Sequence, residues 1–231
     1  MKVCVIIPAY NEEDVISSVI GDVKKEFQKT SYSYEIVVVN DGSVDQTANV
    51  AKKAGATVIQ HILNSGAGSA TATGLNYANQ NGFEIVATMD ADGQHLPKDV
   101  ITGIKTMAQG NIDLLIGSRL IDSKGMSKVK ILGNRGLSFI TFLLFGIKVT
   151  DSQSGLRIFS KESLQKLRWK TSGYEFCSEM LWRANQQGLK IDEFPIKAVY
   201  TEYSISKGQN NWNAINIVKS LLIRRVMETF G

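Results

Sequence analysis

The stretch "FEIVATMDADGQHLPKDV", residues 83 to 100, contains the unit on which the fold is built. Its apolar start predicts a buried strand that ends at Asp90. Oxygen-bearing side chains then alternate along the chain at Asp90, Asp92 and Gln94, and Pro97 suits the first turn of a helix. A buried strand, a polar turn and a helix in succession are typical of α/β proteins.

The same unit recurs through the first half of the chain. Further strands are predicted at "KVCVIIP", "YEIVVVN", "ATVIQHI" and "IDLLIGSR", with helical segments between them. We therefore predict an α/β fold with a mostly parallel, Rossmann-like central sheet and helices on both faces. After residue 120 an apolar helical stretch covers 132–146, and an amphipathic helix covers about 212–229. No linker or internal repeat is evident, so we expect a single domain over 1–231.

Composition and charge narrow the function classes. The 231 residues are 43% hydrophobic and 21% charged, as in ordinary globular domains. Cys4 and Cys177 suggest neither a disulfide framework nor a cysteine metal site, which favours a reducing compartment. Residues 119–170 hold 11 Lys/Arg against 3 Asp/Glu, whereas residues 1–118 hold 8 against 13. This asymmetry favours an anionic partner or a membrane surface, with a solvated lysine-rich surface as the alternative.

The chemically distinctive residues follow the predicted strands, where parallel sheets bind ligands. Asp90 and Asp92 lie on one face of an extended chain, and Gln94 repeats that face. Such an all-oxygen set suits Mg²⁺ or Mn²⁺ and suits zinc poorly. The alternative is an acidic turn that only caps the helix after Pro97.

Two other strand ends suggest a nucleoside site. Asp41 follows a buried strand and could accept hydrogen bonds from a base or ribose, while Gly42 permits close backbone approach. Tyr10 offers a stacking surface and Glu12 an acceptor. Alternatively, Glu12 and its neighbour would be first-turn acids that favour the helix dipole.

These motifs together resemble the family 2 glycosyltransferases of the GT-A fold. The resemblance is carried by "VIIPAYNEE", "IVVVNDGSVDQT", "MDADGQH" and "IGSR", in that order. It continues through "VTDSQSGLRIFSKE" (149–162) and "SISKGQ" (204–209), which look like the dolichyl- and polyprenyl-phosphate mannose synthase group. The resemblance implies an inverting, metal-dependent transfer from a UDP- or GDP-linked nucleotide-sugar to polyprenyl (dolichyl) phosphate. No nucleic-acid partner is expected.

The resemblance also implies roles for individual residues. Residues 1–118 would bind the nucleotide-sugar, and 119–231 the acceptor. The nucleoside would meet Pro8, Tyr10, Glu12, Val39 and Asp41. The diphosphate and its Mg²⁺ or Mn²⁺ would meet Asp90, Ala91, Asp92 and Gln94, with Asp90, Asp92 and Gln94 as metal ligands. Phosphate oxygens would be bound by Arg119, Arg135 and Lys207. Arg119 and Arg135 would bind those of the acceptor, and Lys207 would bind those of the nucleotide-sugar. The catalytic set would be Asp92, Arg119 and Asp151.

The acceptor decides whether a base is needed. A lipid phosphate, with a second pKa near ~6, is already largely dianionic and can attack unaided, whereas a sugar hydroxyl needs a carboxylate base. Asp151 could orient an acceptor or an arginine, or act as that base. A transferase acting on a sugar hydroxyl or polysaccharide therefore stays open, as does a nucleotide- or lipid-binding module without activity.

The sequence departs from the family pattern at two positions. Ala67, in "NSGAGSA", stands where many relatives carry the lysine of a Gly-Lys-Gly. The late loop "EYSISK" also lacks the arginine that precedes Ser-Lys in the mannose synthases. The second departure puts a mannose nucleotide in doubt as the donor.

A lipid acceptor requires contact with a membrane. The run "FITFLLFGI" (139–147) has about half of the ~20 residues needed to cross a bilayer. The C-terminal segment is instead typical of an interfacial helix, with an apolar stripe of Ile215, Val218, Leu222 and Val226 flanked by Lys219, Arg224 and Arg225. We therefore expect a peripheral protein on the cytoplasmic face of an anionic membrane, with 139–147 as a second contact. The alternative is a terminal helix packed on the domain.

Overall fold

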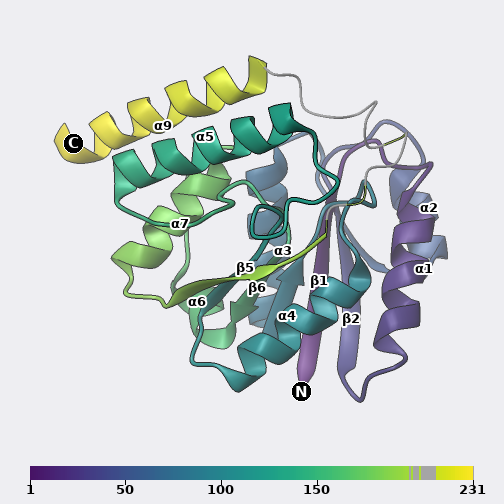
Figure 1. Cartoon of the computed structure of the whole chain (residues 1–231). Helices are drawn as coiled ribbons and strands as arrows, with labels where there is room; N and C mark the ends of the chain where they lie inside the picture. The colour runs from purple at the N-terminus through teal and green to yellow at the C-terminus, as the bar shows by residue number, and fades with distance from the viewer. Residues whose placement is uncertain (198, 200–202, 204–211, 231) are drawn as a thin grey trace.

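The structure, a computed structural model, describes residues 1–197, 199, 203 and 212–230. Its strands form one sheet in the order β3-β2-β1-β4-β6-β5-β7 (Figure 1). The strands are β1 (Lys2–Ala9), β2 (Ser33–Asn40), β3 (Thr57–Gln60), β4 (Ile85–Thr88), β5 (Leu114–Ser118), β6 (Arg157–Ser160) and β7 (Ile191–Pro195). All neighbouring strands are parallel except β6, which runs antiparallel to both β4 and β5. The predicted mostly parallel α/β fold is confirmed.

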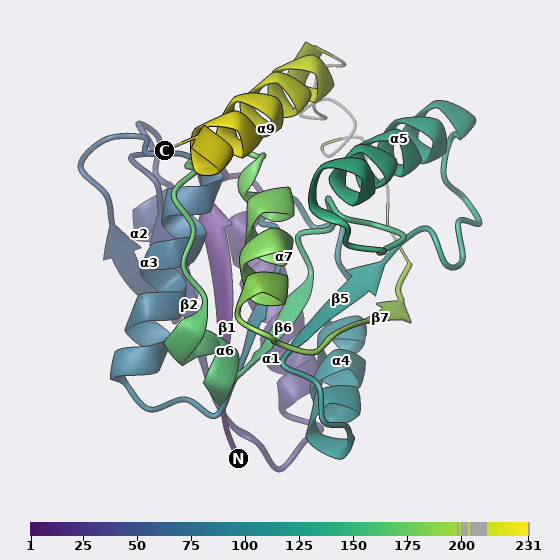
Figure 2. The ribbon, with the colours of Figure 1, turned by 90° about the vertical axis from the view of Figure 1, so that its left-hand side faces the viewer.

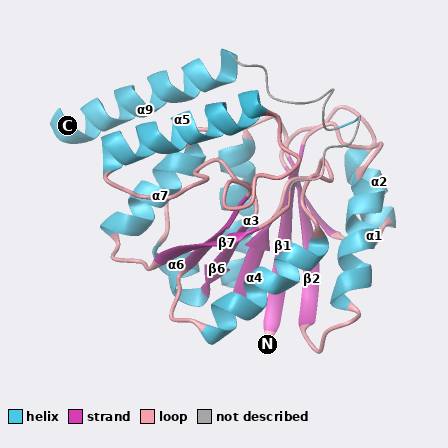
Figure 3. Cartoon of the chain, in the orientation of Figure 1, coloured by secondary structure: helices cyan, strands magenta, loops and turns pink. Residues whose placement is uncertain are grey.

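Helices cover both faces of this sheet (Figures 2 and 3). They are α1 (Ile16–Phe27), α2 (Thr47–Lys53), α3 (Ala67–Gln80), α4 (Pro97–Gln109), α5 (Lys128–Phe145), α6 (Lys161–Lys166), α7 (Phe176–Gln186) and α9 (Trp212–Phe230). The core on one face is built with α1 and α4, and the core on the other with α3, α6 and α7. Helices α5 and α9 contact each other and lie over the carboxyl-end edge of the sheet, at the top of Figure 1, where they also pack against the second core.

Strand β1 shows why the apolar runs are continuous. Val3 and Val5 point into the core beneath α1 and α4, while Cys4 and Ile6 point into the core beneath α3 and α7. All four side chains are fully buried. Because side chains alternate along a strand, a strand that is covered on both faces must be apolar at every position.

Over residues 216–227, where its side chains are described, helix α9 packs on the protein through one side. Ile217 and Leu221 are buried, and Arg224 Nη2 lies 3.3 Å from Oε1 of Glu179, which is fully buried. Despite this burial, hydrogen bonds from Thr171 and Lys170 and the charge of Arg224 lower the pKa of Glu179. Arg224, expected on a membrane-facing flank, therefore holds the helix to the domain.

The opposite side of α9 is exposed. Leu222 and Val226, two members of the expected stripe, are about half exposed. Among the described residues, no helix is long and apolar enough to cross a membrane.

Candidate active site

A cavity of about 730 Å³ opens at the carboxyl ends of the central strands. Its walls come from residues 8–12 at and after the end of β1, residues 88–92 at and after the end of β4, and the start of β6. The first half of α5 closes another side with Lys130 and Asn134. The predicted convergence of these strand ends is therefore what the fold produces.

Asp90 and Asp92 present their carboxylates at this cavity. Gln94 donates to Asp92 twice, from its backbone nitrogen to Oδ1 at 3.0 Å and from Nε2 to Oδ2 at 2.6 Å. His95, only 3% exposed, lies with Nε2 2.9 Å from Oδ2 of Asp90. The turn thus fixes the direction of both carboxylates before any ligand is bound.

The two carboxylates differ in their electrostatics. Burial and the nearby charge of Asp90 raise the pKa of Asp92. Partial loss of water alone would also raise the pKa of Asp90, whose side chain is half exposed, but the hydrogen bond and charge of His95 and the charges of Arg119 and Arg157 lower it. Such opposed shifts are typical of two acids that share one site.

The donor set fits a hard divalent cation. Within the described part of the chain, no three His, Cys, Asp or Glu side chains are grouped to hold a metal ion. The protein would therefore supply Asp90 and Asp92, and other positions would fall to Gln94, water and phosphate oxygens, as Mg²⁺ and Mn²⁺ commonly allow. Gly155 provides the room, since a Cβ there would lie 2.2 Å from Oδ1 of Asp90.

Asp41, which was predicted to meet the nucleoside, already accepts hydrogen bonds from other residues of the protein. It accepts from the backbone nitrogens of Ser65 at 2.9 Å and Gly66 at 2.8 Å, and Nδ1 of His61 lies 2.7 Å from its Oδ1. The close approach at Gly42 is also internal, because a Cβ there would lie 2.5 Å from the backbone of Asn64. Asp41 borders the cavity. Its hydrogen bonds hold Ser65 and Gly66, the two residues just before Ala67 at the start of α3.

The other residues predicted to bind the nucleotide-sugar outside the metal site divide into three groups. Pro8, Tyr10 and Glu12 border the cavity, and Glu12 Oε2 accepts from the hydroxyl of Tyr203 at 2.7 Å. Val39 is fully buried in the core, so its side chain does not border the cavity. Lys207 lies outside the described residues.

Glu12 is also not in the first turn of a helix. Helix α1 begins at Ile16, and the carbonyl of Glu12 instead closes a turn by accepting from the nitrogens of Val15 and Ile16. The alternative that Glu12 is a first-turn acid of the helix is therefore wrong.

Arg119 is held by a buried carboxylate. Its Nε and Nη2 donate to Oδ2 and Oδ1 of Asp151 at 2.7 and 2.8 Å, and its backbone nitrogen donates to Oδ2 at 3.1 Å. Asp151 is fully buried, whereas Arg119 borders the cavity. Of the roles considered for Asp151, this geometry favours orienting the arginine over acting as a base.

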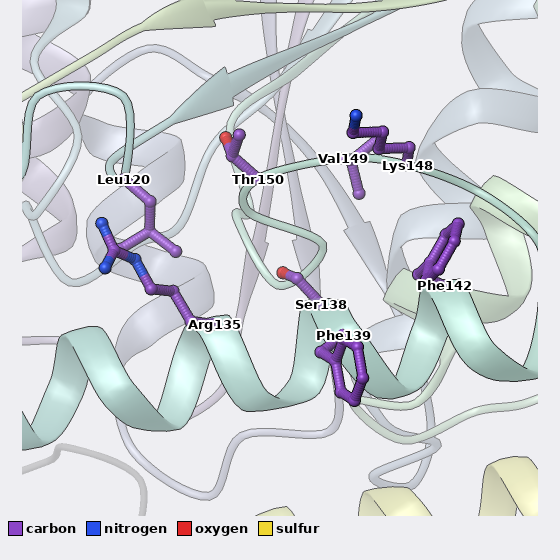
Figure 4. Close-up of a pocket in the computed structure, with 8 residues that line it drawn as sticks. All are labelled: Leu120, Arg135, Ser138, Phe139, Phe142, Lys148, Val149 and Thr150. Carbon is purple, nitrogen blue, oxygen red and sulfur yellow. The ribbon is translucent and has the colours of Figure 1, made fainter.

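A second cavity, of about 520 Å³, lies beside α5 (Figure 4). Arg135 and Lys148 lie toward its two ends, and Phe139 and Phe142 supply an apolar wall. Arg135 therefore does not border the main cavity. Leu120 and Thr150, which border the second cavity, are the sequence neighbours of Arg119 and Asp151. The Arg119–Asp151 pair thus stands between the two cavities.

Some cavity residues were not identified from the sequence. Lys130 borders the main cavity, and burial together with the charge of Arg119 lowers its pKa. Arg157 is almost fully buried and donates to the carbonyl oxygens of Ser152, Ser154 and Cys177. The sequence signal that could have identified Arg157 is its place in "SGLRIFS", within the segment that resembles the mannose synthase group.

Comparison with known proteins adds independent information. Residues 4–168 match the family model for glycosyl transferase family 2. An uncharacterised protein of Methanocaldococcus jannaschii is 45% identical over 97% of this chain and 93% of its own length. The UDP-N-acetylglucosamine–dolichyl-phosphate N-acetylglucosaminyltransferase of Methanococcus voltae is 40% identical over 96% of this chain and 95% of its own.

Two further matches are more distant. The polyprenol monophosphomannose synthase of Mycolicibacterium smegmatis is 28% identical over 89% of this chain and 80% of its own length. The fold is similar to that of glucosyl-3-phosphoglycerate synthase from Mycobacterium tuberculosis in complex with Mn²⁺, UDP-glucose and phosphoglyceric acid. The TM-score is 0.72, with 22% identity over 97% of this chain and 79% of that one.

Proposed function

The chain belongs to glycosyl transferase family 2, and from that premise we propose that it moves a sugar from a nucleotide-sugar to polyprenyl (dolichyl) phosphate, with inversion. One observation carries the proposal. The cavity at the strand ends, which holds Asp90 and Asp92 and is bordered by Arg119, lies next to the basic, apolar cavity beside α5, which is bordered by the adjacent residue Leu120. A transfer between a nucleotide diphosphate and a lipid phosphate requires two such sites next to each other.

The donor would be bound by the first part of the chain, residues 1–118. Tyr10 and Glu12 would contact the nucleoside, and Asp90, Asp92 and Gln94 would hold Mg²⁺ or Mn²⁺ against the diphosphate. When bound there, the cation would supply electrostatic stabilisation of the diphosphate as it leaves. Lys130, on α5, borders the same cavity and would donate to the same phosphate oxygens.

The acceptor would be bound by the second part of the chain, residues 119–231. Arg119 and Arg135 would bind the lipid phosphate, because a guanidinium fork matches phosphate oxygens. Phe139 and Phe142 would contact the first isoprene units. A phosphate dianion attacks without a general base, which agrees with Asp151 being engaged by Arg119.

A UDP-linked amino sugar is the donor to test first. The methanococcal relative, whose name specifies UDP-N-acetylglucosamine, is 40% identical, whereas the mycobacterial mannose synthase is 28% identical. The missing arginine before Ser206-Lys207 points the same way. GDP-linked sugars belong in the same panel.

The enzyme would work at the cytoplasmic face of the membrane as a peripheral protein. Helix α5 exposes Leu132, Phe139 and Leu143, and the neighbouring α9 exposes Leu222 and Val226. These side chains would enter the headgroup boundary, while the basic residues of 119–148 would attract anionic lipid.

The test is a transfer assay in which only the acceptor changes. Polyprenyl phosphate, polyprenol and soluble sugars are offered with the same labelled UDP- and GDP-sugars and Mn²⁺. Labelling of polyprenyl phosphate alone is expected. Labelling of a sugar or polysaccharide instead would favour the hydroxyl-acceptor alternative, and binding without transfer to any acceptor would favour a binding module.

A further inference from the structure

A chain of buried hydroxyl groups lies between the two cavities. Ser138, which borders the second cavity, accepts from the backbone nitrogen of Ser152 at 2.9 Å. Thr141, one turn further along α5, lies 2.8 Å from Ser178 on α7, oxygen to oxygen. The chain ends at Gln153, whose side chain borders the main cavity.

The hydrogen bonds among these buried hydroxyl groups determine which way the side-chain amide of Gln153 faces. Thr141 has one hydroxyl proton, which it donates to the carbonyl oxygen of Leu137 at 2.9 Å. Ser178 must therefore donate to Thr141, and its oxygen is left to accept. Only the nitrogen of an amide can donate to it, so Nε2 of Gln153 faces Ser178, at 3.1 Å.

The carbonyl oxygen of Gln153 is left for a ligand. Nε2 also donates to Oγ of Ser152 at 3.1 Å, so both amide hydrogens point to fully buried serines. Among the described residues, Oε1 has no hydrogen-bond partner, and it is not among the buried unpaired atoms. A half-buried amide with its nitrogen fixed presents a fixed acceptor to the main cavity.

Gln153 also lies where the transferred sugar has to pass. It belongs to the segment 151–155, which holds Arg119 at one end through Asp151 and faces Asp90 at the other through Gly155. In the proposed function the diphosphate is at Asp90 and the acceptor phosphate is at Arg119. In that arrangement the sugar would lie between the two ends of this segment, beside Gln153, which borders the same cavity.

We propose that Gln153 determines donor specificity, its Oε1 accepting a hydrogen bond from the transferred sugar. The sugar group is a donor, either a hydroxyl or the N–H of an acetamido group. The inference rests on the proposed function, because it requires a nucleotide-sugar in the main cavity. A site that hydrogen-bonds a substrate group discriminates strongly against an analogue without that group.

The experiment compares kcat/KM of Gln153→Met and wild type on the donor that wild type prefers. The same comparison is made on analogues of that donor in which one hydroxyl is replaced by fluorine or the acetamido group is removed. Methionine keeps the side-chain length and removes the acceptor. Gln109→Met, on the exposed end of α4, is the matched control. The affinity of the free nucleoside diphosphate with Mn²⁺ is measured in parallel by calorimetry.

Wild type is expected to lose about tenfold or more in kcat/KM on one analogue, the size of one hydrogen bond between ligand and site. Gln153→Met should lose a similar factor on the parent donor and nothing further on that analogue, with diphosphate affinity unchanged. Which analogue it is distinguishes the acetamido group from a hydroxyl. Gln109→Met should reproduce the wild-type pattern.

Two outcomes would overturn the inference alone. Gln153→Met could keep the full wild-type sensitivity to every analogue, or it could weaken the diphosphate as much as the sugar nucleotide. Ser178→Ala, which leaves Oε1 but removes one of the two serine partners of Nε2, is the second variant. Discrimination should be weaker in it than in wild type, and unaltered discrimination would also count against the proposal. If wild type binds no nucleotide-sugar at all, the proposed function fails as well.

Discussion

Replacing Gly155 with alanine should disable the metal site while leaving the fold in place. The added Cβ would lie 2.2 Å from Oδ1 of Asp90, whereas ordinary contact begins near 3.4 Å. The carboxylate would have to retreat by roughly 1 Å, and a misplacement of that size can cost about 100-fold in rate. A 100-fold loss corresponds to about 2.7 kcal/mol of transition-state stabilisation.

The stability cost of this substitution should be smaller. Asp90 is half exposed and can move, but His95 would lose the partner of its Nε2. A buried group left without its hydrogen bond costs about 1–3 kcal/mol, which sets the upper limit on the loss in unfolding free energy.

The assay is kcat/KM with Mn²⁺ and the preferred nucleotide-sugar, with unfolding followed by circular dichroism. Gly21→Ala is the control, because a Cβ at Gly21 in α1 meets no atom within 4 Å. It should keep wild-type activity and gain about 0.5–1 kcal/mol of stability. A Gly155→Ala enzyme within twofold of wild type would refute the reasoning.

Three further predictions concern the diphosphate, the phosphate arginines and the membrane. Asp92→Asn should abolish metal-dependent transfer with little change in melting temperature, and near-normal turnover in Mg²⁺ or Mn²⁺ would contradict the metal assignment. Arg119→Lys should lower affinity for polyprenyl phosphate, and it should also lower the free energy of unfolding by about 1–3 kcal/mol because its bidentate bonds to Asp151 are lost. Arg135→Lys should lower the affinity alone. Wild-type affinity for polyprenyl phosphate in both variants would remove the two arginines from the site. The double variant Leu222→Ser/Arg225→Ala should sediment less with anionic liposomes than wild type does. Ile62→Ser, which also removes an exposed apolar side chain, should sediment like wild type. Failure of the intact protein to sediment at low salt would exclude the membrane contact.

The features that sequence reasoning predicted are local. The buried run before Asp90, the alternation of Asp90, Asp92 and Gln94, and the helix start at Pro97 are all set by neighbours within a few residues. Parallel strands then bring their carboxyl ends to one edge, so the position of the main cavity followed from the strand pattern alone.

The features that were missed depend on contacts distant in sequence. Asp41 was predicted to accept hydrogen bonds from a base or ribose, and its bonds to Ser65 and Gly66, which come 24 and 25 residues later, were not foreseen. Asp151 meets Arg119 across 32 residues, so its role could not be chosen among the alternatives. Strand β6 was not predicted because a four-residue run in a basic segment becomes a strand only between β4 and β5.

The most direct test of the central claim is the chemical identity of the product. Purified protein is incubated with polyprenyl phosphate, the preferred nucleotide-sugar and Mn²⁺, with EDTA in a parallel reaction, and the lipid is analysed by mass spectrometry and ³¹P NMR. We expect a single sugar joined to polyprenol through one phosphate, with inverted anomeric configuration and no product in EDTA. A sugar attached to a hydroxyl group, a pyrophosphate-linked lipid, or full activity in EDTA would contradict it.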